Sequence, residues 1–376
     1  MRGSRRSFLA VLAVLFAVGW MANHFASVIP ALRQHESLSS ELLDGVFGVY
    51  ALGLLPGLLG GGAMSDRAGR APVVLPGAAI AVAGTLAMGA WHAPVGLLVG
   101  RLVVGLGAGL AFGAGTAWAA DLRGVRGTVL AGVVLTCGFA CGPLVSGMLA
   151  QWVAAPLTTP FLVAAALGVG AIVAALYWHS QPAHRALADV AVPVHASAAS
   201  ALGWAMPLAP FVFGCATVAF VTLPARLPEQ HAGPLLPGIA AALTLGTGIV
   251  VQLLARTHGY GPGAGTAGAV FAAAGFGLAS VGGEHPTVLQ FVPCCVLLGA
   301  GYGLCLRSGL LDIEVFAPPA VRGVLTGIFY VGAYLGFALP LLLVLLDPLV
   351  GQTLPLLVLA GLALIAAAAR VMRSAA

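Results

Sequence analysis

Long apolar runs alternate with short polar breaks along the whole chain. Twelve of these runs hold few or no charged residues and are bounded by Pro, Gly or charge. Because about 20 apolar residues cross the hydrocarbon core of a bilayer, each run predicts a transmembrane helix, and the chain is predicted to be an all-α polytopic membrane protein. The predicted helices cover residues 8–31, 41–61, 72–91, 95–117, 127–150, 156–178, 204–225, 234–255, 265–283, 288–309, 321–346 and 350–370.

The longest polar interval, residues 179–203, divides the predicted helices into two sets of six. An internal repeat supports this division. The spacing of Gly105, Gly107, Gly109 and Gly115 is the same as that of Gly299, Gly301, Gly303 and Gly309, and a Val-Arg-Gly triplet follows each set. We therefore predict an N-terminal half at 1–178, a cytoplasmic linker at 179–203 and a C-terminal half at 204–376.

The composition excludes an ordinary soluble domain. Hydrophobic residues make up 60% of the 376 residues and charged residues only 7%, against about a half and a quarter in typical soluble proteins. Lysine is absent, so the formal net charge of +5 rests on arginine. If the N-terminus is in the cytoplasm, nearly all arginines in the segments between the predicted helices lie on the cytoplasmic side of the membrane. Only Arg33 and Arg226 lie on the opposite side. We expect a plasma-membrane protein with both termini in the cytoplasm, embedded in the lipid bilayer and not bound to nucleic acid.

Charge is concentrated in the short segment between the second and third predicted helices. Its candidate residues are Gly62, Asp66, Arg67, Gly69 and Arg70. The two glycines allow tight backbone turns, and the acid can face the positively polarised N-terminus of a helix. Arg70 can pair with an acid at the end of a neighbouring helix, and Asp121, which closes the fourth predicted helix, is the obvious partner.

The order Gly-x-x-x-Asp-Arg-x-Gly-Arg in this segment resembles the signature loop between helices 2 and 3 of major facilitator superfamily transporters. The resemblance implies twelve helices in two six-helix pseudo-repeat halves, with a substrate site near the membrane midplane. It also implies that the segment latches the cytoplasmic side in the outward-facing state, with Asp66 near the start of helix 11 at Arg322. The alternative is a positively charged turn without a switching role. The corresponding loop of the second half, residues 256–259, has no acid, so we expect no second latch there.

Arg101 lies inside the fourth predicted helix, in a segment that resembles the second motif of the same family (Leu-x-x-x-Arg-x-x-x-Gly-x-Gly-Ala, residues 97–108). A charge at this depth costs several kcal/mol unless it faces a partner or water, so Arg101 is a functional-site candidate. The expected partners are His24, beside Asn23 on helix 1, and Asp44 near the start of helix 2. The alternative is a structural arginine that holds backbone carbonyls.

These groups also offer a site for proton coupling. His24 lies about seven residues, roughly 10 Å, from the outer end of its helix, and histidine changes charge in the physiological range. A nearby Arg101 would disfavour protonated His24 and favour ionised Asp44. We expect His24 to be the coupling residue, with Asp44 as the alternative and a structural role for both as the third possibility. Arg307, near the cytoplasmic end of helix 10, either extends to the lipid headgroups or contacts an anion in the cavity.

The fifth predicted helix carries a glycine motif with a proline, formed by Gly138, Gly142, Pro143 and Gly147. Small residues four apart allow close helix contact, and the proline removes a backbone donor and bends the helix. The pattern resembles the antiporter motif of drug:proton exporters, although Ser146-Gly147 stands where that group has Gly-Gly. Generic packing is the alternative.

Together these features predict a proton-coupled exporter of a small amphiphilic molecule that works by alternating access as a monomer. Its partners would be the substrate, protons and lipid. An importer or uniporter of the same fold is the first alternative. We expect no catalytic residue, cofactor or metal site, because no hydrolase or metalloprotease motif is present and the six cysteines lie inside apolar runs. A membrane-embedded enzyme is the remote alternative, and a channel is disfavoured because no ring of charges occurs.

Overall fold

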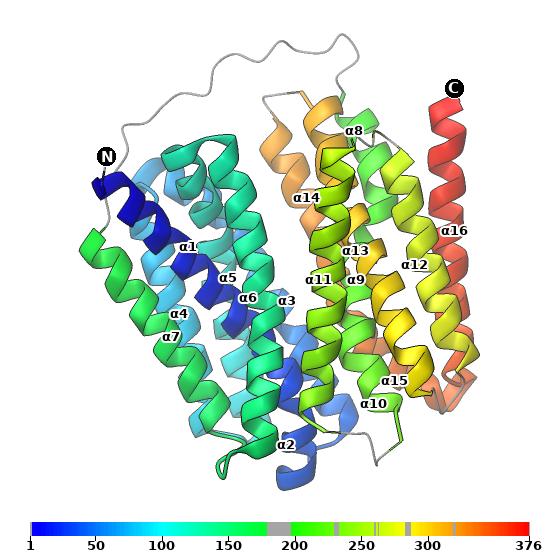
Figure 1. The fold of residues 1–376 in the computed structure, drawn as a ribbon, viewed down its shortest axis with the longest axis horizontal. Coiled ribbons are helices and arrows are strands. Elements are labelled where there is room, and N and C mark those ends of the chain that lie inside the picture. The colour runs from blue at the N-terminus through cyan, green and yellow to red at the C-terminus, as the bar shows by residue number, and fades with distance from the viewer. Residues whose placement is uncertain are drawn as a thin grey trace. The chain divides into compact units, whose positions relative to one another are not determined.

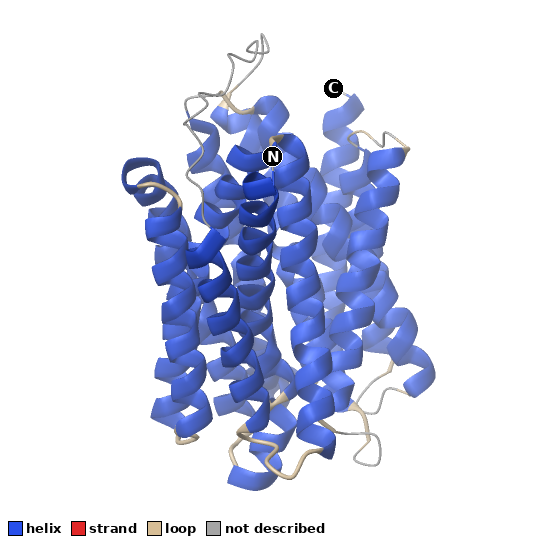
Figure 2. Cartoon of the chain, turned by 60° about the vertical axis from the view of Figure 1, so that its left-hand side comes forward, coloured by secondary structure: helices blue, strands red, loops and turns tan. Residues whose placement is uncertain are grey.

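The computed structural model of the chain describes residues 2–178, 197–228, 233–258, 261, 263–282, 287–318 and 321–375. These residues form helices joined by short loops, and none of them forms a strand (Figure 2). Twelve helical segments are long and apolar enough to cross a membrane. Each of them overlaps one of the twelve predicted runs, so the predicted all-α polytopic fold is confirmed.

The chain forms two compact units, of which the first comprises Met1–Leu187 together with Gly233–Ile239. Its six spans follow one another along the chain (Figure 1). The elements are α1 (Arg2–Asn23), the 3-10 turn η1 (His24–Ser27), α2 (Ile29–Glu36), α3 (Ser40–Ala68), α4 (Ala71–Ala90), α5 (Pro94–Arg123), α6 (Val125–Trp152) and α7 (Thr159–Trp178).

The second unit comprises Ala188–Ala232 and Ala240–Ala376. Two of its spans are not continuous α-helices (Figure 1). The seventh span consists of α8 (Ala198–Ala205), η2 (Met206–Leu208), α9 (Ala209–Thr217), the π-helical η3 (Val218–Thr222) and α10 (Leu223–Arg226). It is followed by α11 (Leu235–Thr257), whose first residues belong to the first unit, and by α12 (Gly263–Val281) and α13 (Val288–Phe316). The eleventh span consists of α14 (Arg322–Tyr334), η6 (Leu335–Ala338) and α15 (Leu339–Val350), and α16 (Thr353–Ala375) is the last.

Several helices extend past their predicted ends, and two of these differences concern the charged segment and the linker. The second helix was expected to end at 61, but α3 continues to Ala68, and of the two expected turn glycines, Gly62 and Gly69, it is Gly69 that has a positive φ, at 92°. An apolar run ends at the membrane edge, whereas the helical hydrogen bonds continue past it, and Arg67 in the last turn is favourable to the helix dipole. The predicted linker also ends early, because α8 begins at Ala198 with a cap in which the Ser197 hydroxyl accepts a hydrogen bond from the Ser200 amide at 3.0 Å. The linker residues 179–196 lie outside the described residues.

The repeated glycines bring helix backbones into contact in both units. In the first unit, a Cβ atom on Gly107 of α5 would lie 2.5 Å from the amide nitrogen of Ala81 in α4. In the second unit, a Cβ atom on Gly303 of α13 would lie 2.5 Å from the carbonyl oxygen of Gly248 in α11. No side chain fits in these places, so the repeat seen in the sequence encodes close helix packing on α5 and α13 alike.

A buried ion pair connects three spans of the second unit. The Arg370 guanidinium on α16 lies 2.7 Å from Asp312 Oδ2 on α13, and it also donates to the carbonyl of Trp204 on α8 at 2.6 Å. Its Cζ atom lies 5.0 Å from the centre of the Trp204 ring. Arg370 is 1% exposed and Asp312 is 6% exposed. A Cβ atom on Gly265 of α12 would lie 2.7 Å from the guanidinium, so glycine leaves room for it.

We predict that Asp312→Asn lowers the thermal unfolding midpoint of the purified protein in detergent. The variant leaves Arg370 buried without its counter-charge, which should cost about 3–5 kcal/mol. Asp347→Asn is the matched control, because Asp347 is only partly buried and is bonded to Gln352 at 2.8 Å. The double variant Asp312→Leu/Arg370→Met should regain most of the lost stability. A double variant no more stable than Asp312→Asn would contradict this role.

Candidate functional site

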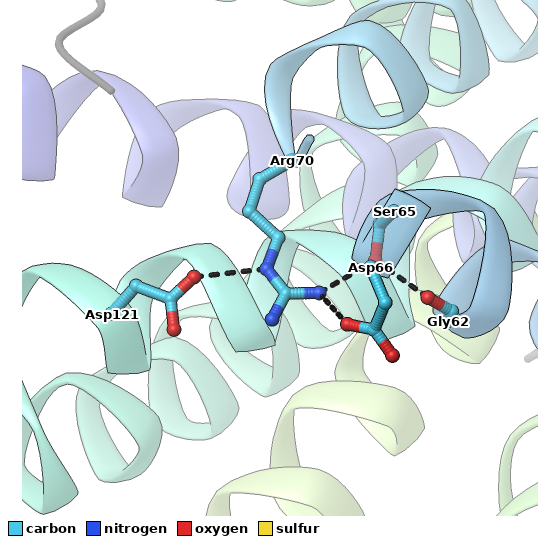
Figure 3. A network of polar contacts seen from close by, with 5 residues as sticks. All are labelled: Gly62, Ser65, Asp66, Arg70 and Asp121. Carbon is cyan, nitrogen blue, oxygen red and sulfur yellow. Dashed lines mark hydrogen bonds and ion pairs between the residues drawn. The ribbon is translucent and has the colours of Figure 1, made fainter. Parts of the chain in front are cut away.

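The end of α3, the start of α4 and the end of α5 carry a network of charged and polar side chains (Figure 3). Gly69 ends α3 with its positive φ, and Arg70 is the N-cap residue of α4, which has Pro in its first turn. This tight connection points the Arg70 side chain toward both Asp66 of α3 and Asp121 of α5 (Figure 3).

Arg70 uses its guanidinium to join three side chains. Its Nε donates to Asp121 Oδ2 at 2.9 Å, and its NH1 lies 2.5 Å from Asp66 Oδ1. The same NH1 donates to the Ser65 hydroxyl at 2.7 Å, and that hydroxyl donates to the carbonyl of Gly62 at 2.8 Å. The structure thus contains the predicted Arg70–Asp121 ion pair and adds Asp66 and Ser65 to it.

The electrostatics of the network differ between its two acids. Burial by itself lowers the pKa of Arg70, but hydrogen bonds to Asp121 and Asp66 and the charges of both acids outweigh burial and raise that pKa above its ordinary value. The Asp121 side chain is 29% exposed and the Asp66 side chain 64% exposed. Exposed ion pairs contribute little to stability, so the bond to Asp66 is the one that is most easily exchanged.

The structure changes one expectation for this segment and adds two observations. Gly62 is not a turn residue, because it lies inside α3 and contributes only its carbonyl. Arg67 is exposed in the last turn of α3, and no partner is recorded for it in the described part of the chain. Ser65, which the sequence reasoning missed, is completely buried and braces Arg70. Its position five residues before the arginine shows no periodic signal, because a loop intervenes.

Arg101 on α5 is held by backbone carbonyls and aromatic rings. It is completely buried, and it donates to the carbonyls of Ala22 at 2.9 Å and Phe47 at 3.2 Å. Its guanidinium also lies over three aromatic rings. These belong to Phe25, Phe47 and Tyr50, at 5.1, 5.5 and 4.6 Å from the ring centres. The expectation that His24 and Asp44 are its bonding partners is wrong, and the alternative, an arginine that holds carbonyls, describes the structure.

The groups expected beside Arg101 occupy separate surroundings. His24 in η1 is completely buried, its ring lies edge-on to Phe161 at 5.1 Å, and neither ring nitrogen has a hydrogen-bond partner among the described residues. Arg101 acts on it only as a nearby like charge when it is protonated. Asn23 donates to the carbonyl of Phe139 on α6 at 2.9 Å, so it links two helices.

Asp44 lies on α3 and is 6% exposed. Its electrostatic neighbours are Arg33 of α2 and Glu41, one turn earlier on α3. Both precede Asp44 in the chain, and no hydrogen bond or ion pair joins Asp44 to Arg101 among the described residues. The predicted single cluster of His24, Asp44 and Arg101 is therefore divided.

The glycines of the helix-5 motif are packing residues in this structure. A Cβ atom on Gly142 would lie 2.8 Å from the carbonyl oxygen of Trp20 on α1, and one on Gly138 would lie still closer to the carbonyl oxygen of Phe16. Pro143 lies inside α6, and Gly147 meets the backbone of Pro234. An antiporter role for these residues stays a prediction.

Arg307 is partly buried on α13. Its Nε has no hydrogen-bond partner in the residues that the structure describes, and Arg256 is the charge that acts on it. Both explanations of Arg307, contact with headgroups and contact with an anion, stay predictions.

Comparisons with known proteins agree with this architecture. The chain is 38% identical to multidrug resistance protein MdtL of Klebsiella pneumoniae (strain 342) over 81 residues, 22% of this chain and 21% of that protein. It is 32% identical to MdtL of Escherichia coli (strain K12 / DH10B) over 84 residues, 22% of each chain. The aligned segments thus span about a fifth of the length of these relatives.

Solved transporter structures share the fold. A mutant of the peptide transporter POT in complex with sulfate matches with a TM-score of 0.81 at 14% identity, over 98% of this chain and 94% of that chain. A POT family transporter in complex with 5-aminolevulinic acid matches with a TM-score of 0.73 at 15% identity, over 96% and 95% of the two chains. The sequence model of the Major Facilitator Superfamily matches residues 9–341. With this match and twelve membrane-spanning helices, the chain belongs to the Major Facilitator Superfamily and is a transporter, not an enzyme.

Proposed function

We propose that this transporter exports a small amphiphilic molecule in exchange for protons. The observation that carries the proposal is the scarcity of charge inside the described spans, where the buried acids, arginines and histidine are His24, Asp44, Arg101, Asp312 and Arg370. Two of these form an ion pair with each other, and Arg101 is occupied by carbonyls and rings. A strongly charged nutrient would find few groups to bind it. The name of the MdtL relatives, multidrug resistance protein, favours the same substrate class.

We assign the role of conformational latch to the cluster of Asp66, Arg70 and Asp121. A charge biases a conformational equilibrium only if it interacts differently with the two states. Asp66 suits this role because its side chain is largely exposed, so its bond to Arg70 can be exchanged for another at little cost. Ser65 and Asp121 keep the guanidinium in place when that exchange occurs. The part of the latch that involves the segment near Arg322 stays a prediction.

Asp44 is the group that we assign to proton coupling, ahead of His24. Protonated His24 would place a second positive charge near Arg101 without an acid to compensate it, because both ring nitrogens lack a partner among the described residues. Asp44 instead has Arg33 as an opposite charge and retains some exposure. Protonation of Asp44 would therefore remove a negative charge that attracts Arg33 of α2.

Asp66→Asn should reduce transport by roughly two- to fivefold while expression and membrane insertion stay near wild-type, because an exposed ion pair contributes up to about 1 kcal/mol. Uptake into inverted membrane vesicles measures the flux. Glu314→Gln, which changes an exposed acid at the end of α13, is the control. If the latch opens, single cysteines near the cluster should become more reactive in the variant. Normal flux together with unchanged cysteine reactivity in Asp66→Asn would contradict the latch role of this cluster.

Arg70→Ala and Asp121→Ala should each impair transport, and the double variant should lose less than the sum of the two effects. Residues in direct contact are not additive, and an interaction of about 0.5–1 kcal/mol corresponds to a factor of roughly two to five in rate. The four fluxes of this double-mutant cycle give the coupling directly. Strict additivity would show that the 2.9 Å bond between these side chains has no part in transport.

Purified protein in lipid vesicles tests proton coupling. With only a pH gradient imposed, the wild-type protein should concentrate its substrate against the substrate gradient, and Asp44→Asn should abolish this while substrate binding survives. His24→Ala should keep gradient-driven transport at a reduced rate. The direction of the effect separates export from import, because an antiporter accumulates substrate on the more acidic side and a symporter on the more alkaline side. Accumulation by Asp44→Asn equal to that of wild-type would place the coupling site elsewhere.

A further inference from the structure

Two spans of the second unit are broken where they cross each other. The seventh span changes to a π-helix at Val218–Thr222, and the eleventh changes to a 3-10 turn at Leu335–Ala338. The hydroxyl of Thr217 donates to the carbonyl of Gly336 at 2.8 Å. A Cβ atom on Gly336 would lie 2.6 Å from the carbonyl carbon of Phe213, so the two backbones touch. Irregular backbone at membrane depth occurs where it is packed in protein or lines a cavity, and interrupted helices often form transporter binding sites.

Aromatic rings from four elements, α9, α13, α14 and η6, gather at this crossing. Phe213 of α9 stacks on Tyr334 of α14 with a centre-to-centre distance of 4.5 Å and an interplanar angle of 26°. Phe213 also lies 5.3 Å from Phe337 and 6.3 Å from Tyr302 of α13. Tyr330 lies 6.3 Å from Tyr334, one turn along α14. The helices α9, α13 and α14 that supply most of these rings are in mutual contact (Figure 1).

The two accessible sides of α14 differ in chemistry. One side is aliphatic and exposed, with Val324 at 64%, Ile328 at 38% and Leu335, in η6, at 63% exposure. The side chains of Thr326 and Tyr330, four residues apart, form a second, partly exposed and polar side. Residues four apart share a helix face, and the aliphatic side suits lipid. We therefore place the partly exposed polar side toward the aqueous transport route.

Tyr330 lies at a depth suited to substrate binding. It is eight residues from the start of α14, which corresponds to about 12 Å along a helix. The hydrocarbon core is about 30 Å thick, so a span that enters it near Arg322 would carry the ring close to its middle. The cluster offers the faces and edges of its rings for recognition.

We infer that Tyr330, backed by Tyr334 and Phe213, is a stacking platform for an aryl group of the transported molecule. The inference deepens the proposed function, because it assigns an aryl-bearing lipophilic compound as the substrate class. Aromatic pairs are favourable beyond their buried area in stacked and edge-to-face geometries, and a ring without fixed charge accepts neutral and cationic aryl compounds alike. The neighbouring rings fix the orientation of Tyr334, so Tyr330 is the specificity-determining member at the accessible edge.

Binding of a matched pair of probes tests the inference. Tetraphenylphosphonium and tetrabutylphosphonium carry the same charge and are similar in size, but only the first has aryl groups. Calorimetric titration of the purified full chain in detergent, without any gradient, should show tighter binding of tetraphenylphosphonium. Tyr330→Leu should reduce this preference by roughly two- to tenfold, the size expected for loss of one aromatic contact. Tyr330→Phe, which keeps the ring, should bind as wild-type does.

The control is Tyr177→Leu, because Tyr177 is 82% exposed at the end of α7 and lies in the first unit. The inference is overturned if the wild-type protein binds both probes equally or binds neither. It is also overturned if Tyr330→Leu keeps the wild-type preference for tetraphenylphosphonium. Photolabelling of the wild-type protein with an aryl azide derivative of the phosphonium tests the same site without a variant, and so does not depend on whether Tyr330→Leu folds. Labels on residues 326–337 support the platform, and labels only elsewhere contradict it. Aryl-selective binding without gradient-driven transport would contradict the proposed export and still support the platform. Gradient-driven transport without aryl-selective binding would contradict the platform and still support the proposed export.

Discussion

A charged group inside the hydrocarbon core of a bilayer must be compensated by the protein itself, and this constraint decides what each buried arginine of the chain can do. Arg101 is compensated by two backbone carbonyls and three aromatic rings. Arg370 is compensated by Asp312, by a carbonyl and by an indole ring. In both cases the compensating groups come from other helices. Each buried arginine therefore fixes several helices of its own unit to one another.

The cluster around Arg70 uses the same chemistry at the edge of a span, where its energetics are different. The Asp66 side chain is 64% exposed, whereas Arg370 is 1% exposed. Water can replace Asp66 as a partner of Arg70 at little cost, but nothing can replace Asp312 in the interior without leaving a buried charge. The exposed cluster suits a contact that forms and breaks during transport, and the buried pair suits a contact that holds one unit rigid.

The parts of this arrangement that were predictable from sequence follow from local patterns. Hydropathy alone located the twelve spans, and the glycine repeat correctly indicated close packing on α5 and α13. The Arg70–Asp121 pair could be predicted because a charged loop and the charged end of a helix must meet at the same membrane face.

The parts that were missed depend on partners that leave no sequence signal. Every residue has a backbone carbonyl, so the sequence cannot show which carbonyls bind Arg101. The cluster with Asp44 and His24 that was expected around Arg101 is wrong for this reason. Asp312 and Arg370 are 58 residues apart on different helices, and no periodicity connects them. The sequence did not show that Gly62 is helical, because a change from apolar to polar residues indicates where the chain leaves the membrane and not where the helix ends.

Proton release on substrate binding is the most direct test of the central claim, that substrate and proton exchange through this transporter. Adding tetraphenylphosphonium to the purified protein in weakly buffered detergent should acidify the solution, because an antiporter binds substrate and proton in competition, and Asp44→Asn should give no signal. Binding without any change in pH, or with proton uptake instead of release, would contradict proton-coupled export.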